Sequence, residues 1–566
     1  MNPSKAYFDL LKTWTDTLLT YQLNDAAHPS LDGALLCPAC GVIHGRCHDA
    51  IYPLLYLADA TGEEKYLSAA RKLYGFMSYM ICDDGSLYND SQSDWNGVTV
   101  FSAIGMAHAL KYHGHLLKKD EKADWETRLH KMALWLMGNI TPAKRTNINY
   151  HAANAAAMAL CGDYFRDESM KTAGRKLADY VFGCVTEHGL VYGEGTPVKK
   201  LSPRGVHPID IGYNVEETIP SLVEYAAVSG DAEAMEKARF IARGQLDFML
   251  PDGAWDNSFG TRNFKWTYWG SRTSDGCLAA FNALGREEPV FAEAAYRNFR
   301  LMASCTDGLL YGGPHYKVRG ELPCVHHSFD HIKVLAQILD EGVTEFERCA
   351  LPSENPPKLM TYSECGTYRV SVGDWRATFT NGDFDYMKCG HVSGGAMTLL
   401  WHKTPGPVCA AGNTDFILKE AHNQQLTRKK KTLGCVCPRI EKILDGVRYS
   451  QIYDYNVSLT AEETEDGAIL TSEGTLCDLE HRPMDGENYK VTYRLNAEGV
   501  TIEGIAPGTC FLLPLIPREG ITVTSETLVG EETEVFNFAP GFTARLLRVG
   551  TDDNGHFSLH IGARNK

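Results

Sequence analysis

The residues HAANAAAMALCGDYF (151–165) and DESMKTAGRKLADYVFG (167–183) are two neighbouring segments of opposite composition. The first consists mostly of small apolar residues, whereas the second alternates charged and apolar residues with the period of an amphipathic helix. A helix that is apolar all round must be packed all round, but an amphipathic helix needs only one covered face. The pair therefore predicts a helical hairpin with an inner and an outer helix.

The same kind of pair recurs along residues 1–350. Further apolar segments rich in small residues begin near positions 48, 97, 214, 274 and 326, with charged amphipathic segments between several of them. Intervals of roughly 50 to 65 residues suit one helical hairpin with its loops. We therefore predict an (α/α) toroid of about six hairpins, possibly incomplete, as the catalytic domain over 1–350. An open helical solenoid is the alternative.

From residue 360 onward the pattern has a period of two. Runs such as TYRVSVG, YKVTYRLN and VTIEGIA alternate apolar and polar residues between turn residues. This pattern predicts an antiparallel β-sandwich over 360–566. Proline and polar residues gather in LPSENPPKLM (351–360), where we expect the domain boundary. The predicted fold class is thus multidomain, α and then β.

Charge and composition limit the possible partners. The 566 residues carry a formal net charge of −16, which argues against nucleic acid. No run reaches the roughly 18 apolar residues that a membrane span needs. Charged residues interrupt the first apolar segment, unlike a signal peptide, and 17 cysteines, an odd number, suit a reducing compartment. We expect a cytoplasmic protein without membrane partners; the sequence leaves its oligomeric state open.

The loops that enter the inner helices hold most of the unusual side chains. Such loops meet at one end of a toroid, and here they gather basic and aromatic residues in an acidic chain. Cations attract a carboxylated ligand, and aromatic rings can stack on a sugar, so an acidic oligosaccharide is the expected partner. The predicted substrate-binding residues are His44, Arg46, Asp94, Trp95, Asn147, Arg204, Asp256, Arg262, Lys265, Trp266, Tyr268, Trp269, Arg272, His315 and His326.

Several of these residues have a plainer interpretation. Asp94 and Asn147 stand where helices begin and can act as caps, and the aromatic loop 251–276 can pack on the β-domain. The first loop also holds cysteines. Cys37, Cys40, His44 and Cys47 could ligate zinc, but their spacing fits no common zinc finger. We therefore predict a site without a cofactor or metal and keep zinc as an alternative.

The plan of a toroid followed by a β-sandwich, with these loops, resembles the heparinase II/III-like and alginate-lyase group of polysaccharide lyases. In that group a helix start carries an Asn or His that neutralises a uronate carboxylate, and an acidic Gly-Glu-Gly-like stretch precedes the catalytic Tyr. Here Asn149 and His151 resemble the first feature, and VYGEGTP (191–197) followed by Tyr213 resembles the second. Tyr192 is the alternative tyrosine.

The resemblance implies β-elimination next to a uronate carboxylate. Neutralising the carboxylate stabilises the enolate-like intermediate, a role for Asn149, His151 and a nearby Arg. Tyr213 would then move the proton, with its pKa lowered by cations such as Arg204 or His207. The predicted catalytic residues are Tyr213, His151, Asn149, His207 and Glu194.

Other functions fit the same scaffold. A glycoside hydrolase, of the glucuronidase or unsaturated-glucuronyl hydrolase type, would need a pair of carboxyl groups. Candidates for that pair are Asp94, Glu194, Asp210, Glu216, Asp256 and Asp275. A uronate epimerase would begin with the same proton abstraction as a lyase. A non-catalytic carbohydrate-binding protein is the third alternative, although it would not need so many titratable groups at one rim.

Overall fold

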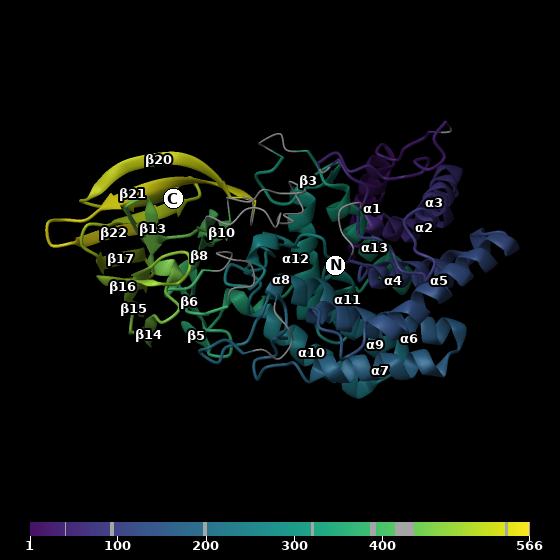
Figure 1. Cartoon of the computed structure of the whole chain (residues 1–566), viewed down its shortest axis with the longest axis horizontal. Helices are drawn as coiled ribbons and strands as arrows, with labels where there is room; N and C mark the ends of the chain where they lie inside the picture. Colours follow the sequence, from purple (N-terminus) through teal and green to yellow (C-terminus); the bar gives the residue numbers. More distant parts are fainter. Residues whose placement is uncertain are drawn as a thin grey trace.

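The structure is a computed structural model that describes residues 1–25, 27–39, 41–90, 95–195, 201–317, 322–384, 392–413, 435–537 and 541–564. Helices fill the N-terminal part and strands the C-terminal part, side by side along the long axis of the molecule (Figure 1). The predicted order, helical domain and then β-domain, is confirmed. No helix among the described residues is long and apolar enough to cross a membrane.

Six inner helices form a closed ring. Each contacts the next one in the chain, and the last, α13, contacts the first, α2. The helical domain is therefore a complete (α/α) toroid within the described residues. The inner helices are α2 (Ile51–Thr61), α4 (Thr99–His113), α6 (Ile148–Phe165), α9 (Ile219–Ser229), α11 (Leu278–Leu284) and α13 (Val325–Glu341).

An outer helix packs against each inner helix. In five hairpins it follows the inner helix in the chain, but α13 is covered by the N-terminal helix α1. Short turns lead into the inner helices, among them η1 (Gly45–Ala50), α8 (Ile211–Tyr213) and the π-helical turn η3 (Asn214–Thr218). The outer helices are α1 (Ser4–Leu19), α3 (Glu64–Met77), α5 (Lys119–Asn139), α7 (Glu168–Phe182), α10 (Ala232–Leu246) and α12 (Pro289–Ser304).

The hairpin of α6 and α7 shows how the sequence sets these elements. Helix α6 ends at Arg166 in the left-handed conformation, with φ 56°. Asp167 then caps the start of α7, where its side chain accepts hydrogen bonds from the backbone N–H groups of Ser169 and Met170. A Cβ on Gly174 would lie 3.1 Å from the Ala155 carbonyl oxygen. The small residues therefore let the two helices approach closely.

The β-domain is a sandwich of two antiparallel sheets. Val370 and Phe379 from the smaller sheet share one core with Val491 and Tyr493 from the larger sheet. The smaller sheet holds β5 (Leu359–Tyr362), β6 (Thr367–Val372), β7 (Trp375–Thr380), β8 (Ala396–His402) and β9 (Gly406–Ala410) in sequence order.

The larger sheet supplies the outer layer of the sandwich. Its strands pair antiparallel, with β14 joined to β15 at one side. They are β12 (Arg439–Leu444), β13 (Val447–Ser450), β14 (Ser458–Glu463), β15 (Gly467–Cys477), β16 (Pro483–Asn496), β17 (Gly499–Ile505), β18 (Cys510–Leu515), β19 (Ile521–Thr524), β20 (Leu528–Asn537), β21 (Phe542–Gly550) and β22 (His556–Ala563). Three two-stranded pairs complete the described strands: β1 (Trp266–Thr267) with β2 (Gly270–Ser271), β3 (Thr306–Asp307) with β4 (Leu309–Leu310), and β10 (Gly412–Asn413) with β11 (Cys435–Val436).

The aromatic loop 251–276 joins the two domains. Trp266 and Tyr268 belong to one buried cluster with Trp401 and Phe542 of the β-domain. The indole N–H of Trp401 donates to the Tyr268 hydroxyl at 2.9 Å, and Trp266 is 0% exposed. The prediction that Trp266 and Tyr268 stack on a sugar is therefore wrong, since their rings fill the core between the domains.

Because this seam is apolar and closed, we predict that Trp401→Ala destabilises the protein. Removing a buried Trp costs about 3–5 kcal/mol, and the loss should appear as a lower denaturation midpoint of the β-domain. Phe240→Ala is the matched control, because Phe240 lies on α10 and is 46% exposed. Equal midpoints for the two variants would contradict a closed core at the seam.

Candidate active site

Tyr213 lies at the end of α8, where the chain turns into an inner helix. Its backbone N–H donates to the Asp210 side chain at 3.0 Å, which fixes the start of the turn. Its hydroxyl lies 3.1 Å from both the Arg272 carbonyl oxygen and the Thr273 hydroxyl. The guanidinium of Arg262 lies over the ring, 3.7 Å from its centroid. Tyr213 is thus held by Asp210, just before α8, and by loop 251–276.

The pKa of Tyr213 does not move in the predicted direction. Burial raises it, and the guanidinium of Arg262 opposes the rise without reversing it. The expected neighbours, Arg204 and His207, lie elsewhere. Arg204 donates to backbone carbonyls of the β-domain, and His207 stacks on Tyr192 at 4.0 Å between centroids. The predicted roles of Arg204 and His207 beside Tyr213 are therefore wrong.

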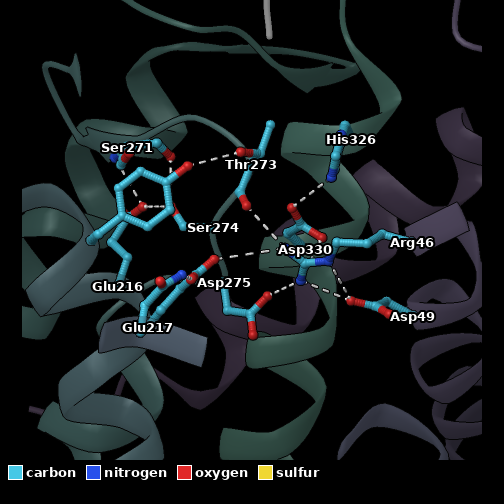
Figure 2. Close-up of polar contacts among 12 residues, drawn as sticks. Arg46, Asp49, Glu216, Glu217, Ser271, Thr273, Ser274, Asp275, His326 and Asp330 are labelled. Atoms are coloured by element: carbon cyan, nitrogen blue, oxygen red, sulfur yellow. Dashed lines mark hydrogen bonds and ion pairs between the residues drawn. The ribbon is translucent and has the colours of Figure 1, made fainter. Parts of the chain in front are cut away.

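Thr273 connects Tyr213 to the charged groups of the site. Its hydroxyl contacts Tyr213 and lies 3.4 Å from the Lys265 ammonium, and its carbonyl accepts from Arg46 at 2.9 Å (Figure 2). Its φ of 61° is in the left-handed region, which a β-branched residue rarely adopts. Such strain persists only where the surroundings impose it, and it is common at functional sites.

Glu194 links the start of α6 to Arg262. One carboxyl oxygen accepts the backbone N–H of Asn149 at 2.8 Å, and the other pairs with Arg262 at 3.0 Å. Burial raises the pKa of Glu194 to about 7, although Arg262 acts to lower it. Asn147, just before α6, accepts the backbone N–H of Gly195 at 3.2 Å. Hydrogen bonds therefore hold the Gly-Glu-Gly stretch (193–195) against the start of α6, the helix that carries Asn149.

Asn149 and Glu217 form a buried pair on neighbouring inner elements. The Asn149 amide nitrogen donates to the Glu217 carboxyl group. Burial raises the pKa of Glu217 to about 8, with Arg46 acting in the opposite direction, so Glu217 holds a proton at neutral pH. The side-chain oxygen of Asn149, Oδ1, has no hydrogen-bond partner among the described residues. The pair can therefore offer both a donor and an acceptor to a ligand.

Arg46 is the centre of a buried ion cluster (Figure 2). It pairs with Asp49 at 2.8 Å, with Asp330 at 3.0 Å and with Asp275, and it donates to the Thr273 carbonyl. These groups come from η1, α13 and the loop after β2. Every nitrogen of Arg46 already has a protein acceptor. The prediction that Arg46 binds substrate directly is wrong, because Arg46 organises the loops around the site.

Lys333 balances the remaining charge of this cluster. Its ammonium lies 3.0 Å from Asp49 and 3.1 Å from Asp275. Burial raises the pKa of Glu217, and it raises that of Asp330 well above its usual range. A raised pKa favours the neutral form of a carboxyl group, which lessens the excess of negative charge in this buried cluster.

Two histidines adjoin the cluster on the side of the first loop. The His326 ring lies 3.5 Å from the Asp330 carboxyl group and 4.6 Å, between centroids, from the ring of His44. Burial lowers the pKa of His326 well below its usual range, and His44 adds to the effect. His326 is therefore a neutral imidazole beside the acidic cluster, close to the predicted substrate end of the toroid.

His151 does not belong to this group. Its ring bonds the Thr141 carbonyl at 3.1 Å and packs on Tyr180 of α7. Residues 149 and 151 are two positions apart on one helix, so their side chains point about 200° apart. Because Asn149 faces Glu217 in the centre, His151 must face the outer layer. The predicted catalytic role of His151 is wrong.

Four further predicted contacts also have structural partners instead. Asp256 accepts from the Ser258 hydroxyl at 2.7 Å and from Thr378 of the β-domain. Trp269 is buried with its indole N–H on a backbone carbonyl, the Arg272 guanidinium bonds the Tyr316 hydroxyl, and the His315 ring accepts a backbone N–H of the β-domain. The packing of loop 251–276 on the β-domain, the plainer interpretation above, accounts for Asp256, whereas Trp269 and Arg272 bond groups of the helical domain.

Some predictions stay open. Asp94 lies outside the described residues, and so does Cys40. Trp95 is half-buried, and its indole N–H donates to the Tyr150 hydroxyl at 2.9 Å, so it borders the residue next to Asn149. Lys265 reaches Thr273, as described above. Trp95 and Lys265 therefore stay predicted substrate contacts.

Sequence reasoning missed the cluster that holds the site together. Asp49, Asp330 and Lys333 lie inside segments whose composition predicts apolar inner helices, and Thr273 has no sequence signal beyond its loop. A signal did exist. Charged residues in a helix that must be packed all round need buried partners, and HHSFDHIKV (326–334) has two such residues.

The fold and the site together define a class of enzyme: polysaccharide lyases built on an (α/α) toroid with a docked β-sandwich. The ulvan lyase N-terminal domain family matches residues 11–354, and the ulvan lyase C-terminal domain family matches residues 359–530. A curated relative, the broad-specificity ulvan lyase of Formosa agariphila, is 36% identical over 529 residues, which cover 90% of this chain and 82% of the relative. The chain belongs to the ulvan lyase family.

Solved structures with similar folds include lyases of other substrates. Heparan sulfate lyase HepC from Pedobacter heparinus matches 92% of this chain and 76% of its own, with 11% identity and a TM-score of 0.48. The chondroitin AC lyase of Streptomyces coelicolor A3 matches 99% and 83%, with 12% identity and a TM-score of 0.47. The assignment rests on the two family matches and the curated relative. The protein is a polysaccharide lyase that cleaves uronic-acid polysaccharides.

The buried Glu217 predicts a pH-dependent stability. Its pKa is raised from 4.5 to about 8 in the folded protein, so above pH 4.5 the unfolded chain loses a proton that the folded protein keeps. The free energy of unfolding should therefore fall as pH rises from about 5 to 8, by at most about 1.4 kcal/mol per pH unit. Glu217→Gln should flatten this slope by about one proton in urea denaturation at several pH values.

Glu168→Gln serves as the matched control, because the Glu168 side chain is 81% exposed. Its slope should equal that of the wild type. A slope that is the same for the Glu217 variant and the wild type would show that Glu217 is ionised in the folded protein.

Proposed function

We propose that this protein depolymerises ulvan by β-elimination, with Tyr213 as the residue that moves the proton. The observation that carries the proposal is the position of the Tyr213 hydroxyl. It meets Thr273 at 3.1 Å while Arg262 covers its ring at 3.7 Å, and Arg262 pairs with Glu194, which in turn holds Asn149. The curated relative supports ulvan as the substrate.

The uronate carboxylate is assigned to the Asn149 and Glu217 pair. The Asn149 amide nitrogen donates one of its two N–H groups to Glu217, which leaves the other for the substrate, and a protonated Glu217 can donate its O–H to the same uronate carboxylate. Two neutral donors then replace the solvation of the carboxylate without adding a negative charge. That stabilises the enolate-like intermediate formed when the neighbouring carbon loses its proton.

Tyr213 carries the proton through the reaction. As a phenolate it takes the proton from the carbon next to the carboxylate. The electron pair of that C–H bond forms the new C4–C5 double bond, the bond from C4 to the glycosidic oxygen breaks, and the same proton passes to that oxygen. Burial disfavours the phenolate, so the reaction depends on the positive groups that face Tyr213.

A chain of hydrogen bonds links the Lys265 ammonium to the Tyr213 hydroxyl oxygen through Thr273. The Lys265 ammonium lies 3.4 Å from the Thr273 hydroxyl oxygen. With Lys265 donating, the Thr273 hydroxyl is free to donate to the phenolate. Hydrogen bonds to the charged form of a group favour that form. Thr273 thus acts as a positioning residue between a cation and the reacting side chain.

Two of the described carboxyl groups that the hydrolase alternative could use are already bound by other groups. Glu194 is bound by Arg262 and the backbone of Asn149, and Asp256 is bound by Ser258 and Thr378 at the domain seam. Neither carboxyl group is placed to activate a water. The membership of a lyase family agrees with this.

We predict that Tyr213→Phe lowers kcat on ulvan by at least about 100-fold, because it removes the acid and base of the reaction. Tyr192→Phe, the other tyrosine considered, is the matched control and should keep wild-type activity, since the Tyr192 hydroxyl donates to the Gly183 carbonyl. Activity is read from the ultraviolet absorbance of the unsaturated product. Mass spectrometry checks the reaction type, because elimination conserves total mass and hydrolysis adds a water.

A Tyr213→Phe variant with full activity and a wild-type thermal midpoint would overturn the assignment of Tyr213. Products that have gained a water would overturn the lyase reaction itself.

Two substitutions of Thr273 test the role of its hydroxyl, because one removes the hydroxyl and the other keeps it. Thr273→Val keeps the shape of the side chain but removes the hydroxyl, and should lower kcat about 10-fold, the effect of one hydrogen bond to a charged group. Thr273→Ser keeps the hydroxyl and should retain kcat. KM should be unchanged in both. Equal kcat values for the valine and serine variants would show that Thr273 acts only through packing.

A further inference from the structure

We propose that Cys37, His44 and Cys324 form a zinc site that closes the toroid. These three residues lie outside the proposed reaction, and the site does not depend on the identity of the substrate. Their potential ligand atoms all lie within 4.8 Å of one another. All three side chains are buried, with at most 1% exposed.

The spacing of the two sulfurs fits a shared metal ion. The Sγ atoms of Cys37 and Cys324 lie 3.8 Å apart, and both residues are thiols, not halves of a disulfide. Two thiolates at the usual Zn–S distance of about 2.3 Å, in tetrahedral geometry, lie about 3.8 Å apart. A disulfide would need about 2.05 Å. The observed distance is that of two neighbouring ligands of one ion.

The ligand types select the metal. Two thiolates and one imidazole suit zinc, whereas calcium and magnesium prefer oxygen ligands. Three protein ligands leave the fourth position of a tetrahedral zinc ion to a water or another donor. The set differs from the one that the sequence spacing predicted. Cys47 is turned away, with its thiol on the Leu35 carbonyl at 3.7 Å, and Cys324, 287 residues from Cys37, takes part instead.

The position of the site explains what the ion would do. Cys37 and His44 belong to the loop that leads into η1, and His44 is the residue just before it. Cys324 is the residue just before α13. One ion would therefore join the entrance of the first inner helix to the entrance of the last, the place where the ring closes.

The same ion would also orient the ion cluster of the active site. His44 packs on His326, which lies beside Asp330, and Arg46 follows His44 by two positions. Fixing His44 and Cys324 thus fixes two elements that supply the cluster. A metal that binds only the folded protein stabilises it by mass action.

The site is tested on the full-length protein expressed with zinc and purified without chelators. We expect about one zinc per chain by plasma mass spectrometry, and less than about 0.2 in Cys37→Ser and Cys324→Ser. Cys161→Ser is the matched control, because Cys161 is a buried thiol in the middle of α6. It should keep the metal. Exchange of zinc for Co²⁺ should give the near-ultraviolet absorption of thiolate-to-cobalt charge transfer.

Several results would overturn the proposal. One is a wild-type protein without zinc and without the cobalt band after reconstitution. Another is a Cys37–Cys324 disulfide found by peptide mass mapping. A third is an equal zinc content in the Cys37→Ser, Cys324→Ser and Cys161→Ser variants. If the serine variants do not fold, the site is tested instead by titrating the thiols of the wild-type protein with a mercurial reagent and measuring the zinc released. Zinc must then be released as the buried thiols react, and zinc that stays bound after every thiol has reacted refutes the site.

Discussion

The buried ion cluster around Arg46 is the interaction on which the rest of the active site depends. Taking charges out of water is expensive unless every charge has a partner at the right distance. Here the partners come from η1, η3, α13 and the loop after β2, four elements spread over the ring. The arrangement is stable only when the toroid is closed, and then it brings Thr273, Glu217 and so Asn149 to fixed positions. Tyr213 depends on the cluster through Thr273.

The sequence was sufficient to predict the architecture because a helix that is buried on all sides consists mostly of small and apolar residues. Segments such as 151–165 can only be inner helices, and all six begin within about five residues of where the pattern places them. The site was harder. Tyr213, Asn149, Glu194 and Arg262 are brought together as predicted, but loop 251–276 has the same composition whether it faces a sugar or another domain. The prediction for His151 was wrong for a simpler reason. His151 and Asn149 are two positions apart on one helix, so their side chains point in nearly opposite directions.

Protonation links the stability of the site to its chemistry. Four carboxyl groups share two cations, and burial raises the pKa values of Glu217 and Asp330. A proton on Glu217 makes it a hydrogen-bond donor. In the proposed reaction the uronate carboxylate meets this neutral donor, although the chain as a whole carries a net charge of −16.

The closure of the ring has a consequence for the synthesis of the protein. Helix α13 packs on both α1 and the first inner helix α2, so the last hairpin is completed by residues that were synthesised long before α13. Until Val325–Glu341 emerges, the sides of α1 and α2 that pack on α13 are uncovered. The nascent toroid must therefore wait for contacts of very long sequence separation, which makes folding slow and exposes apolar surface meanwhile. Shielding of the unfinished ring by chaperones is a natural requirement of such a topology.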